Sequence, residues 1–515
     1  MTTKRPRHLG GTKSKTGCNT CKIRRVRCGE EKPHCLRCTS TGRRCCYNNP
    51  SPPRTTGRPQ LQLVSFSNQG SRERRAFEYY FHQAGPSLSG VLDRAFWRGS
   101  VLQFCRREPV VWDAIISLSA LYERPPVHET PPEQLINYPA AVKHCYHHEA
   151  LVWYSRSLSR LQQRINQGVA DLTVSLISCV LFIAIELLQG NRMAAQALYK
   201  QGAQMMVSAL SAPTTTSAAL EPIFRRIGTW VLIMNGASDV CWDLNLAVPD
   251  ESFVSIEEAR DVLYGIMAEL KALNVDCKAY LRMTGDARLH EVPDLATRQQ
   301  HLKSRLSQWY RLFTCLEPVQ DTSIGGATAL LLMTYTGILI ESEACLNPDH
   351  SIYDSYEYEF AQIVDWAPIA VAWTRSSDGE QPPLMFEMGV FLPLFITGLK
   401  CPFPHLRRRA IQCLRDSPPA QGFFMSVPAS HIVSIIVGLE ENPTFLPKQA
   451  SDVDDLLAQP GRIPEPENRT IDFSVSSGSD KEGMLRSWLH YTLHHFDSEG
   501  RIEFVQRTIP LPNFA

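Results

Sequence analysis

Residues 18–45 read CNTCKIRRVRCGEEKPHCLRCTSTGRRC, and they hold six cysteines in two copies of one spacing, C-x2-C-x6-C. The first copy begins at Cys18 and the second at Cys35. Each cysteine of the second copy follows its counterpart by 17 residues, which indicates an internal duplication. The six cysteines are Cys18, Cys21, Cys28, Cys35, Cys38 and Cys45.

This cysteine spacing predicts a metal centre. Six thiolates give two tetrahedral zinc ions four ligands each only if two sulfurs are shared. Sulfur then fills every position and leaves no open site for water or substrate, so we expect two structural Zn²⁺ ions. A single four-cysteine site from the two C-x2-C pairs is an alternative, but it leaves the duplication unexplained. Cys46 is a further thiol and an alternative to Cys45 as the last ligand.

The charge of the chain is concentrated in its first part. Residues 1–60 carry 15 Lys/Arg against 2 Asp/Glu, whereas the other 455 residues carry 38 against 50. A basic segment joined to a mildly acidic one predicts a polyanionic partner for the basic segment. This asymmetry argues against a single-domain cytosolic enzyme.

The cations within the cysteine cluster predict how a nucleic acid is read. Short helices are expected to begin at each C-x2-C pair, and the first would carry four cations over about one and a half turns. Arg24 and Arg25, near its middle, are candidates for bidentate contacts to guanine in the major groove of double-stranded DNA. The candidates for phosphate contacts are Lys22, Arg27, Lys13, Lys15, Arg43 and Arg44. The alternatives are a solvated basic face and a zinc-stabilised protein-binding knuckle.

The cluster, with KIRRVRC at residues 22–28 and KPHC at residues 32–35, resembles the Zn₂Cys₆ binuclear cluster of fungal transcription regulators. The resemblance implies that Cys18 and Cys35 bridge the two zinc ions. It implies that Cys21 and Cys28 complete one site, and that the other is completed by Cys38 and Cys45. It also implies that the helix after Cys21 enters the major groove at a CGG-type triplet, with Arg24 and Arg25 as the base-contacting pair.

Beyond the cluster the sequence predicts an all-α domain in an antiparallel helix-pair or solenoid-like arrangement. Ser255 and Glu258 form a capping-box pattern at the start of one of its helices. The longest apolar run, residues 172–188, contains four polar residues and predicts a buried helix sooner than a membrane span. The expected helices cover residues 71–83, 93–106, 109–123, 140–166, 172–188, 193–210, 255–273, 302–316, 327–346, 356–373, 384–399, 406–414 and 431–439.

Four short stretches of this domain resemble, in order, the helical regulatory domain attached to many fungal zinc-cluster proteins. They are RAFEYY at 75–80, LQGN at 188–191, FVSIEEAR at 253–260, and KC at 400–401 followed by RRRA at 407–410.

The sequence predicts five segments. They are a basic N-terminal arm at 1–17, the Zn₂Cys₆ DNA-binding domain at 18–46, a flexible linker at 47–70, the all-α regulatory domain at 71–445, and an acidic or polar loop with a helical tail at 446–515. The linker is rich in proline and polar residues and has no heptad repeat. A homodimer would therefore form through the helical domain.

Other motifs carry less information. No nucleotide-binding loop, nucleophile elbow or zinc-protease motif is present. The histidine-rich residues 144–149 and the pair His490 and His494 have spacings suited to one face of a helix, but we interpret them as packed or solvated side chains. Cys401 is interpreted as a structural thiol, and residues 452–457 alternate acids and hydrophobes as activation segments do.

The sequence as a whole predicts a nuclear, sequence-specific DNA-binding regulator of RNA polymerase II transcription that is not an enzyme. Its expected partners are double-stranded DNA and a second copy or another protein at the helical domain, and no membrane. The alternatives are a zinc-stabilised protein-interaction scaffold and a nucleic-acid-associated enzyme delivered by its zinc module.

Overall fold

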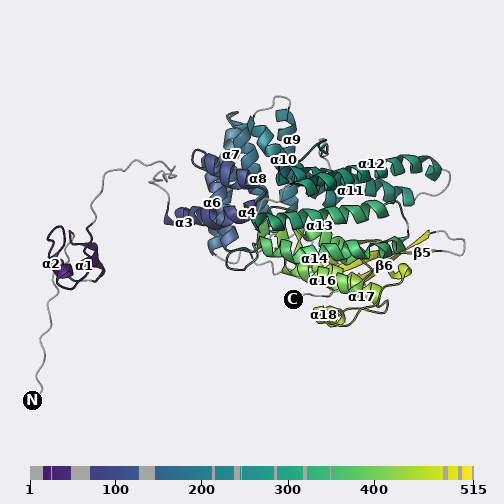
Figure 1. The fold of residues 1–515 in the computed structure, drawn as a ribbon. Coiled ribbons are helices and arrows are strands. Elements are labelled where there is room, and N and C mark those ends of the chain that lie inside the picture. Colours follow the sequence, from purple (N-terminus) through teal and green to yellow (C-terminus); the bar gives the residue numbers. More distant parts are fainter. Residues whose placement is uncertain are drawn as a thin grey trace, which may run out of the picture. The chain divides into compact units, whose positions relative to one another are not determined.

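The computed structural model describes residues 16–24, 26–47, 70–126, 145–210, 215–236, 244, 246–282, 287–316, 322–347, 349–479, 485–496 and 502–512. The chain divides into two compact units, Met1–Asn68 and Gln69–Ala515 (Figure 1). Most of the predicted N-terminal arm and most of the predicted linker lie outside the described residues.

Within its described residues, the smaller unit has two short helices, α1 (Asn19–Ile23) and α2 (Leu36–Thr39). Its buried core consists of the six duplicated cysteines, against which the partly buried Tyr47 packs. Such a core is too small to stabilise a fold by apolar burial, so the unit depends on what the sulfurs bind.

The larger unit is predominantly helical, as the sequence predicts. Its first part contains α3 (Ser71–Tyr79), the π-helical η1 (Tyr80–Ala84), α4 (Gly85–Ser89), the π-helical η2 (Ala95–Ser100), α5 (Val101–Cys105), α6 (Pro109–Glu123), α7 (Cys145–Asn166), α8 (Leu172–Leu188), α9 (Arg192–Leu210) and α10 (Thr215–Asn235). Its second part contains α11 (Ile256–Leu281), α12 (Ala287–Cys315), α13 (Thr322–Ala344), the 3-10 helix η4 (His350–Tyr356), α14 (Glu357–Thr374), α15 (Phe391–Lys400), α16 (Pro404–Asp416), α17 (Ser426–Glu441), α18 (Ala450–Ala458) and the 3-10 turn η5 (Pro466–Asn468).

Consecutive helices pack against each other in pairs: α6 with α7, α8 with α9, α11 with α12, and α13 with α14. Figure 1 shows α11, α12, α13 and α14 running side by side. α8 lies in the core and is buried at every residue from Val174 to Leu188, which confirms the prediction of a buried helix. In the described part of the chain, no helix combines the length and the apolarity that crossing a bilayer requires.

Helix boundaries follow local chemistry where the sequence offers it. The Ser255 side chain accepts a hydrogen bond from the Glu258 amide at 3.2 Å and so begins α11 as predicted. The Glu258 carboxylate, however, accepts from the amide of Val254 at 2.6 Å rather than from that of Ser255. Several helices were not predicted. α10 contains Pro222, and the first half of α12 is too polar to show an apolar stripe. The short α4 and α18 were missed as well, and α18 lies in the segment predicted as an acidic or polar loop.

The helix predicted from residue 384 begins later. Leu384–Met385 form strand β1, which pairs in parallel with β2 (Ala420–Gln421), and β2 pairs antiparallel with β3 (Phe424–Met425). Gly389 has a φ of 59°, which glycine adopts easily and which separates β1 from α15. The Tyr122 hydroxyl donates to the Leu384 carbonyl at 3.0 Å across 262 residues of sequence.

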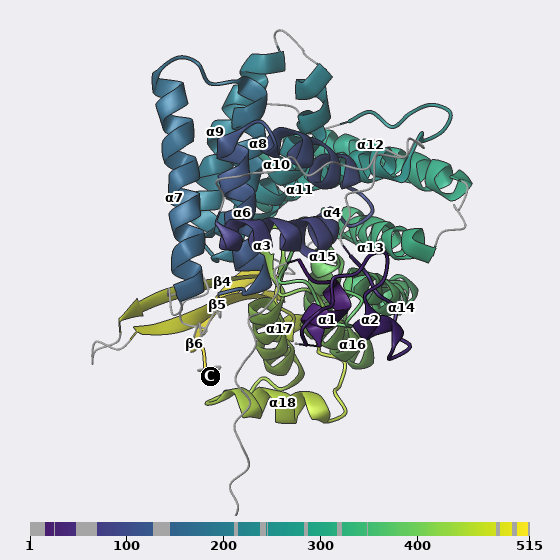
Figure 2. The ribbon, with the colours of Figure 1, turned by 90° about the vertical axis from the view of Figure 1, so that its left-hand side faces the viewer.

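The predicted helical tail is wrong, because residues near the C-terminus form an antiparallel sheet. Its strands are β4 (Asp472–Ser479), β5 (Leu485–Phe496) and β6 (Ile502–Pro510), in the order β4-β5-β6. Leu489, Tyr491 and Leu493 alternate along β5 and share a buried apolar cluster with α17. The ribbon of α17 lies next to this sheet (Figure 2). A period of two is the strand pattern, and the weaker helical spacing of the histidines concealed it.

The strand also corrects the geometry expected for His490 and His494. Four residues along a strand are about 13 Å apart, so these two side chains cannot share a metal ion as they would on a helix. The His490 ring instead bonds Ser476 at 2.7 Å and Thr508 at 2.9 Å.

The alternating acids of residues 452–457 lie in α18, where the Asp452 carboxylate accepts hydrogen bonds from the amides of Lys448 and Gln449.

A buried network of charges joins distant parts of the larger unit. Arg226 on α10 donates to both carboxylate oxygens of Asp93 at 2.8 Å, and both side chains are less than a tenth exposed. Arg260 on α11 bonds Glu387 at 3.2 Å and Asp93 at 3.3 Å. The Tyr264 hydroxyl donates to the other Glu387 oxygen at 2.7 Å.

The charges of this network sustain one another. Burial lowers the pKa of the Arg260 guanidinium, but Asp93, Asp261 and Glu387 raise it by more, so Arg260 remains charged. Burial together with Glu387 raises the pKa of the Tyr264 hydroxyl well above its ordinary value, which keeps it a donor.

Three consecutive arginines of α16 make ion pairs of decreasing burial. Arg407 pairs with Glu440 of α17 at 2.7 Å and both are buried, and Arg408 pairs with Glu441 at 2.8 Å. Arg409 pairs with Asp365 of α14 at 2.7 Å, where both side chains are about half exposed or more. The RRRA motif at 407–410 therefore fastens α16 to two neighbouring helices.

Arg260→Met should lower the free energy of unfolding of the larger unit by about 3–5 kcal/mol, because it leaves Glu387 and Asp93 buried beside fewer cations. Urea denaturation followed by tryptophan fluorescence measures this, since all nine tryptophans lie beyond residue 96.

The matched control is Arg409→Met, which removes an exposed pair and should cost about 1 kcal/mol or less. Equal destabilisation by the two substitutions would contradict the importance given to the buried network.

Candidate metal centre and nucleic-acid interface

Two equivalent loops build the cysteine cluster. Cys18 and Cys35 both have extended backbones and stand at the N-caps of α1 and α2. The Cys18 amide donates to the Cys28 sulfur at 3.3 Å, and the Cys35 amide donates to the Cys45 sulfur at 3.3 Å. The sequence duplication is thus also a duplication of hydrogen bonds.

Both α1 and α2 end before the third cysteine of their repeat, and the chain leaves the two helices through equivalent hydrogen bonds. The Val26 amide bonds the Cys21 carbonyl at 3.1 Å, and the Arg43 amide bonds the Cys38 carbonyl at 2.9 Å. A helix continued from Cys21 to Cys28 would separate their backbones by about 10 Å along its axis. Their sulfurs lie within 4.8 Å of each other, so the chain has to turn back.

The early end of α1 corrects the prediction that four cations share one and a half helical turns. Among them, only Lys22 lies within the described span of α1, while Arg24 is its C-cap residue and Arg27 follows it. The requirement that the third cysteine return to the metal outweighs the helical propensity of the basic residues.

The sulfurs form two overlapping groups of four. Within each group all sulfurs lie within 4.8 Å of one another, and both groups contain Cys18 and Cys35. The groups are Cys18, Cys21, Cys28 and Cys35, and Cys18, Cys35, Cys38 and Cys45. Cys28 and Cys45 thus belong to the groups, which disfavours a single site made from the two C-x2-C pairs alone.

The sulfur separations fit zinc. The Cys18 sulfur lies 3.7 Å from the sulfurs of Cys35 and Cys38, and the Cys21 sulfur lies 3.7 Å from that of Cys35. A tetrahedron of sulfurs at the usual zinc–sulfur distance of about 2.3 Å has edges of about 3.8 Å. All six sulfurs belong to buried residues, so zinc held there would be shielded from water and would serve a structural purpose.

Zinc binding to these sulfurs is coupled to the release of protons, because several of the thiols are protonated in the absence of metal. Burial raises the pKa of the Cys21 and Cys38 thiols to about 12 in the absence of metal. Burial also acts to raise the pKa of the Cys18 thiol, but the Cys21 amide and neighbouring thiols bring it below its ordinary value. Because the thiolate is the ligand, zinc displaces the remaining protons, and acid competes with zinc.

Cys46 and Tyr47 follow the last cysteine of the cluster, but only Tyr47 contacts one of the six sulfurs. Cys46 is exposed and belongs to neither group of the described cysteines, which favours Cys45 as the last ligand. The Tyr47 hydroxyl lies 3.5 Å from the Cys28 sulfur, and this hydrogen bond raises the pKa of Tyr47. The sequence reasoning missed Tyr47, and its position just after the last cysteines was the available signal.

The described cations of the cluster lie on its surface. Lys22, Arg27, Arg43 and Arg44 are exposed, and none of them forms an ion pair within residues 16–24 and 26–47. Arg24 is partly exposed, and its guanidinium donates to the Thr41 hydroxyl at 3.4 Å. Lys13, Lys15 and Arg25 lie outside the described residues.

Arg37 is one further exposed cation, which the sequence reasoning missed. It lies inside the second C-x2-C pair, whereas the predicted DNA contacts lie in the N-terminal arm and the six-residue gaps.

Comparison with protein families gives two matches. The fungal Zn(2)-Cys(6) binuclear cluster domain matches residues 16–54. The fungal specific transcription factor domain matches residues 75–427, more than half of the chain. The chain belongs to the fungal zinc-cluster transcription factors. The resemblance seen in the sequence is thereby confirmed, and the cluster domain of this family binds DNA and holds two structural Zn²⁺ ions.

Curated relatives are transcription regulators as well. The chain is 24% identical to the aspercryptin biosynthesis cluster-specific transcription regulator atnN of Emericella nidulans over 355 residues, which cover 60% of this chain and 55% of that protein. It is 47% identical over 51 residues to transcription factor lfc1 of Flammulina velutipes, covering 10% of this chain and 17% of that factor. The matches thus span about half of the first relative and less of the second. No solved structure matches the chain.

Removing zinc from this zinc-cluster factor with a strong chelator should unfold residues 16–47 and leave the larger unit folded. The sulfurs are the core of the smaller unit, and zinc binding supplies about 10–16 kcal/mol in comparable modules. Trypsin cleavage within the cluster should become rapid, while tryptophan fluorescence stays unchanged. Lowering the pH from 7 to about 5 should have the same effect, since protons displace zinc from thiolates. A cluster that resists trypsin after complete zinc loss would contradict this prediction.

Proposed function

We propose that the chain is a nuclear, sequence-specific DNA-binding regulator of RNA polymerase II transcription that reads a CGG-type triplet in the major groove. The observation that carries the proposal is the pair of overlapping four-cysteine groups beside exposed cations that lack ion pairs in the described cluster. Rigid zinc–sulfur geometry can hold those cations in place before DNA arrives, which lowers the cost of binding.

Each cysteine has a specific task in this proposal. Cys18 and Cys35 bridge the two zinc ions, because each belongs to both groups of four. Cys21 and Cys28 complete one zinc site, and the other is completed by Cys38 and Cys45. The assignment gives each zinc ion four sulfurs from six residues.

The cations divide into base readers and phosphate contacts. Arg24 and Arg25 read guanine edges, for which the planar guanidinium is suited because it donates two parallel hydrogen bonds. The bond from Arg24 to Thr41 supports this, since it restrains the side chain next to the end of α1. The phosphates are contacted by Lys22, Arg27, Lys13, Lys15, Arg43 and Arg44, which position the module on the duplex.

The helical domain supplies regulation or partner contacts in this proposal. One cluster of about 30 residues contacts too few base pairs to select sites in a genome, so a second DNA-binding subunit or partner is required. The segment before the helical domain has no heptad repeat, so recruitment of that subunit is assigned to the helical domain.

The bridging assignment predicts unequal effects of cysteine substitutions. Cys18→Ser or Cys35→Ser should leave fewer than one tightly bound zinc ion per chain, because a bridging thiolate serves both metals. Cys45→Ser should leave about one, because only one site loses a ligand. Native mass spectrometry counts the ions, with Cys46→Ser as the matched control that should retain two. Identical zinc loss from Cys18→Ser and Cys45→Ser would refute the bridging assignment.

The reading assignment predicts a difference between Arg25 and Arg43. Arg25→Ala should cost about 1–3 kcal/mol on the preferred site and flatten the preference at one or two base pairs. Arg43→Ala should weaken binding to all sequences alike and reduce its salt dependence. Selection of sites from random DNA, followed by salt titrations, separates the two effects. A protein whose affinity for DNA does not change with salt would instead be a protein-interaction scaffold.

A further inference from the structure

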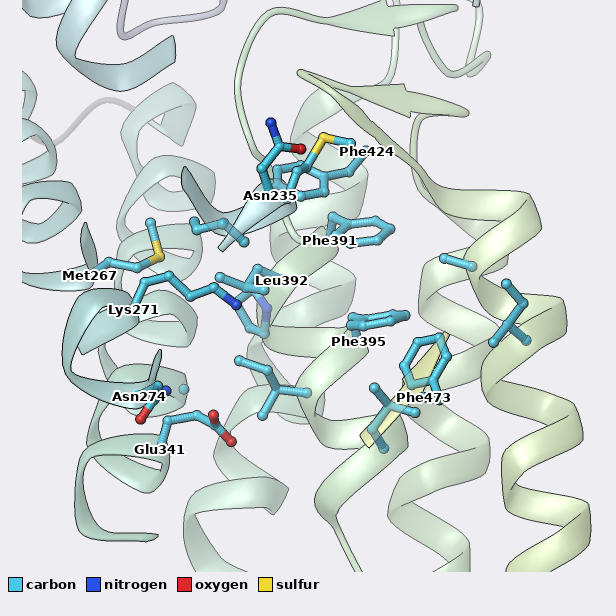
Figure 3. A pocket seen from close by; sticks show the side chains of 18 of the residues that line it. Asn235, Met267, Lys271, Asn274, Glu341, Phe391, Leu392, Phe395, Phe424 and Phe473 are labelled. Atoms are coloured by element: carbon cyan, nitrogen blue, oxygen red, sulfur yellow. The ribbon is translucent and has the colours of Figure 1, made fainter. Parts of the chain in front are cut away.

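The helical unit contains a cavity of about 660 Å³ that the DNA-binding role does not use (Figure 3). It is walled by α11, α13, α15 and the start of β4, with contributions from neighbouring segments. Its lining includes Met267 and Phe391, which belong to the main hydrophobic core of the helices. It also includes Ile432, which belongs to a smaller hydrophobic core that α17 forms with the C-terminal sheet. The volume lies in the range of small-molecule sites, about 300–1,000 Å³.

One wall of the cavity is aromatic. Phe391 and Phe395 stack along α15 with ring centroids 5.2 Å apart, and Phe395 lies 6.2 Å from Phe473 of β4. Figure 3 shows these three rings on the same side of the cavity. A flat or branched apolar group packed there would be removed from water against rigid rings.

Opposite the rings, Lys271 and Asn274 of α11 and Glu341 of α13 make the lining polar (Figure 3), and the lining as a whole carries an excess of positive charge. The ionisable residues of the lining are Arg192, Lys271, Lys278, Lys400, Glu341 and Asp472. Both carboxylates already have partners. Asp472 lies 3.5 Å from the Lys278 ammonium, and Glu341 accepts from the Tyr353 hydroxyl at 3.4 Å.

Two lysines of the lining, Lys400 of α15 and Lys271 of α11, differ in the partners of their ammonium groups. Lys400 donates to the backbone carbonyls of Thr470 and Ile471 at 3.2 and 2.9 Å. Lys271 forms neither a hydrogen bond nor an ion pair with the described residues, and its side chain extends into the cavity toward Leu392 (Figure 3). Burial lowers the pKa of Lys271 and the nearby Lys278 lowers it further, while Glu341 and Asp472 raise it by less. A partly buried ammonium without a partner is unfavourable, and an anion beside it relieves the cost.

We propose that this cavity binds a small amphipathic organic anion, whose acidic group pairs with Lys271 and whose apolar body packs against Phe391 and Phe395. The inference concerns the helical unit alone and does not rest on the DNA-reading proposal. Such an occupant contacts both α11 and α15 and so stabilises their present arrangement.

The test uses the full zinc-loaded chain without DNA and two fluorescent probes of nearly the same shape. Anilinonaphthalene sulfonate carries an anionic group, and N-phenylnaphthylamine lacks it. We expect saturable one-to-one binding of the sulfonate and a rise in the unfolding temperature of the helical unit. Lys271→Met should weaken sulfonate binding by about tenfold or more and leave N-phenylnaphthylamine binding unchanged.

Two further variants make the result specific. Lys448→Met removes an exposed lysine outside the cavity lining and should change neither affinity. Leu392→Trp fills the cavity and should abolish binding of both probes, with circular dichroism showing that the helices persist. Equal loss of both probes in Lys271→Met would overturn the assignment of the anion site. Sulfonate binding that survives Leu392→Trp, or that never saturates, would overturn the cavity as the site.

Discussion

The larger unit depends on two arginines, Arg226 and Arg260, that are almost completely buried. Arg226 and Arg260 belong to different helices, yet both reach Asp93, and Arg260 also reaches Glu387. A buried guanidinium is tolerated only when carboxylates and carbonyls surround it, so these helices cannot exchange places without leaving charges unpaired. Apolar burial provides most of the driving force for packing, but leucines and valines are interchangeable in a way that a charge network is not. The network therefore selects one arrangement among the many that would bury a similar apolar area.

In the smaller unit, sulfur and metal chemistry select a single arrangement of the chain in place of buried ion pairs. Its six sulfurs replace a hydrophobic core, and two amide-to-sulfur hydrogen bonds of 3.3 Å repeat at matching positions of the duplication. Hydrogen bonds to sulfur from the backbone orient the ligands before the metal is bound, as the supporting shell of a metal site must. The rigid part of the module is thus its sulfur cage, and the exposed cations around it are held by short turns instead of by long helices.

The sequence was most informative where one chemical requirement fixed the spacing of residues. Zinc coordination set the positions of the cysteines, and continuous apolarity from 172 to 188 predicted the buried α8. The early end of α1 could also have been predicted, because a helix reaching Cys28 would carry its sulfur away from Cys21.

Other features depend on contacts between residues far apart in sequence. Arg226 and Arg260 fall on the apolar stripes of their helices, which signals that each needs a buried acid but does not say which one. The sheet near the C-terminus was missed because the preference of a segment for the strand conformation depends on the residues that pack against it. One face of β5 is buried because it packs with α17, and this contact cannot be inferred from the sequence of β5 alone. The cavity lies where segments from both hydrophobic cores meet, and no local sequence pattern predicts a cavity of this kind.

The hydrogen bond from Tyr122 to Leu384, 262 residues apart, has a consequence for biosynthesis. A ribosome adding about 5–20 residues per second needs roughly 13–50 s to make the intervening stretch. During that interval α6 has emerged without the strand that its tyrosine contacts, and Asp93 waits for the arginines that neutralise it. The first helices of the unit must therefore remain soluble in the cell while incomplete, which makes them natural clients for chaperones that bind nascent chains.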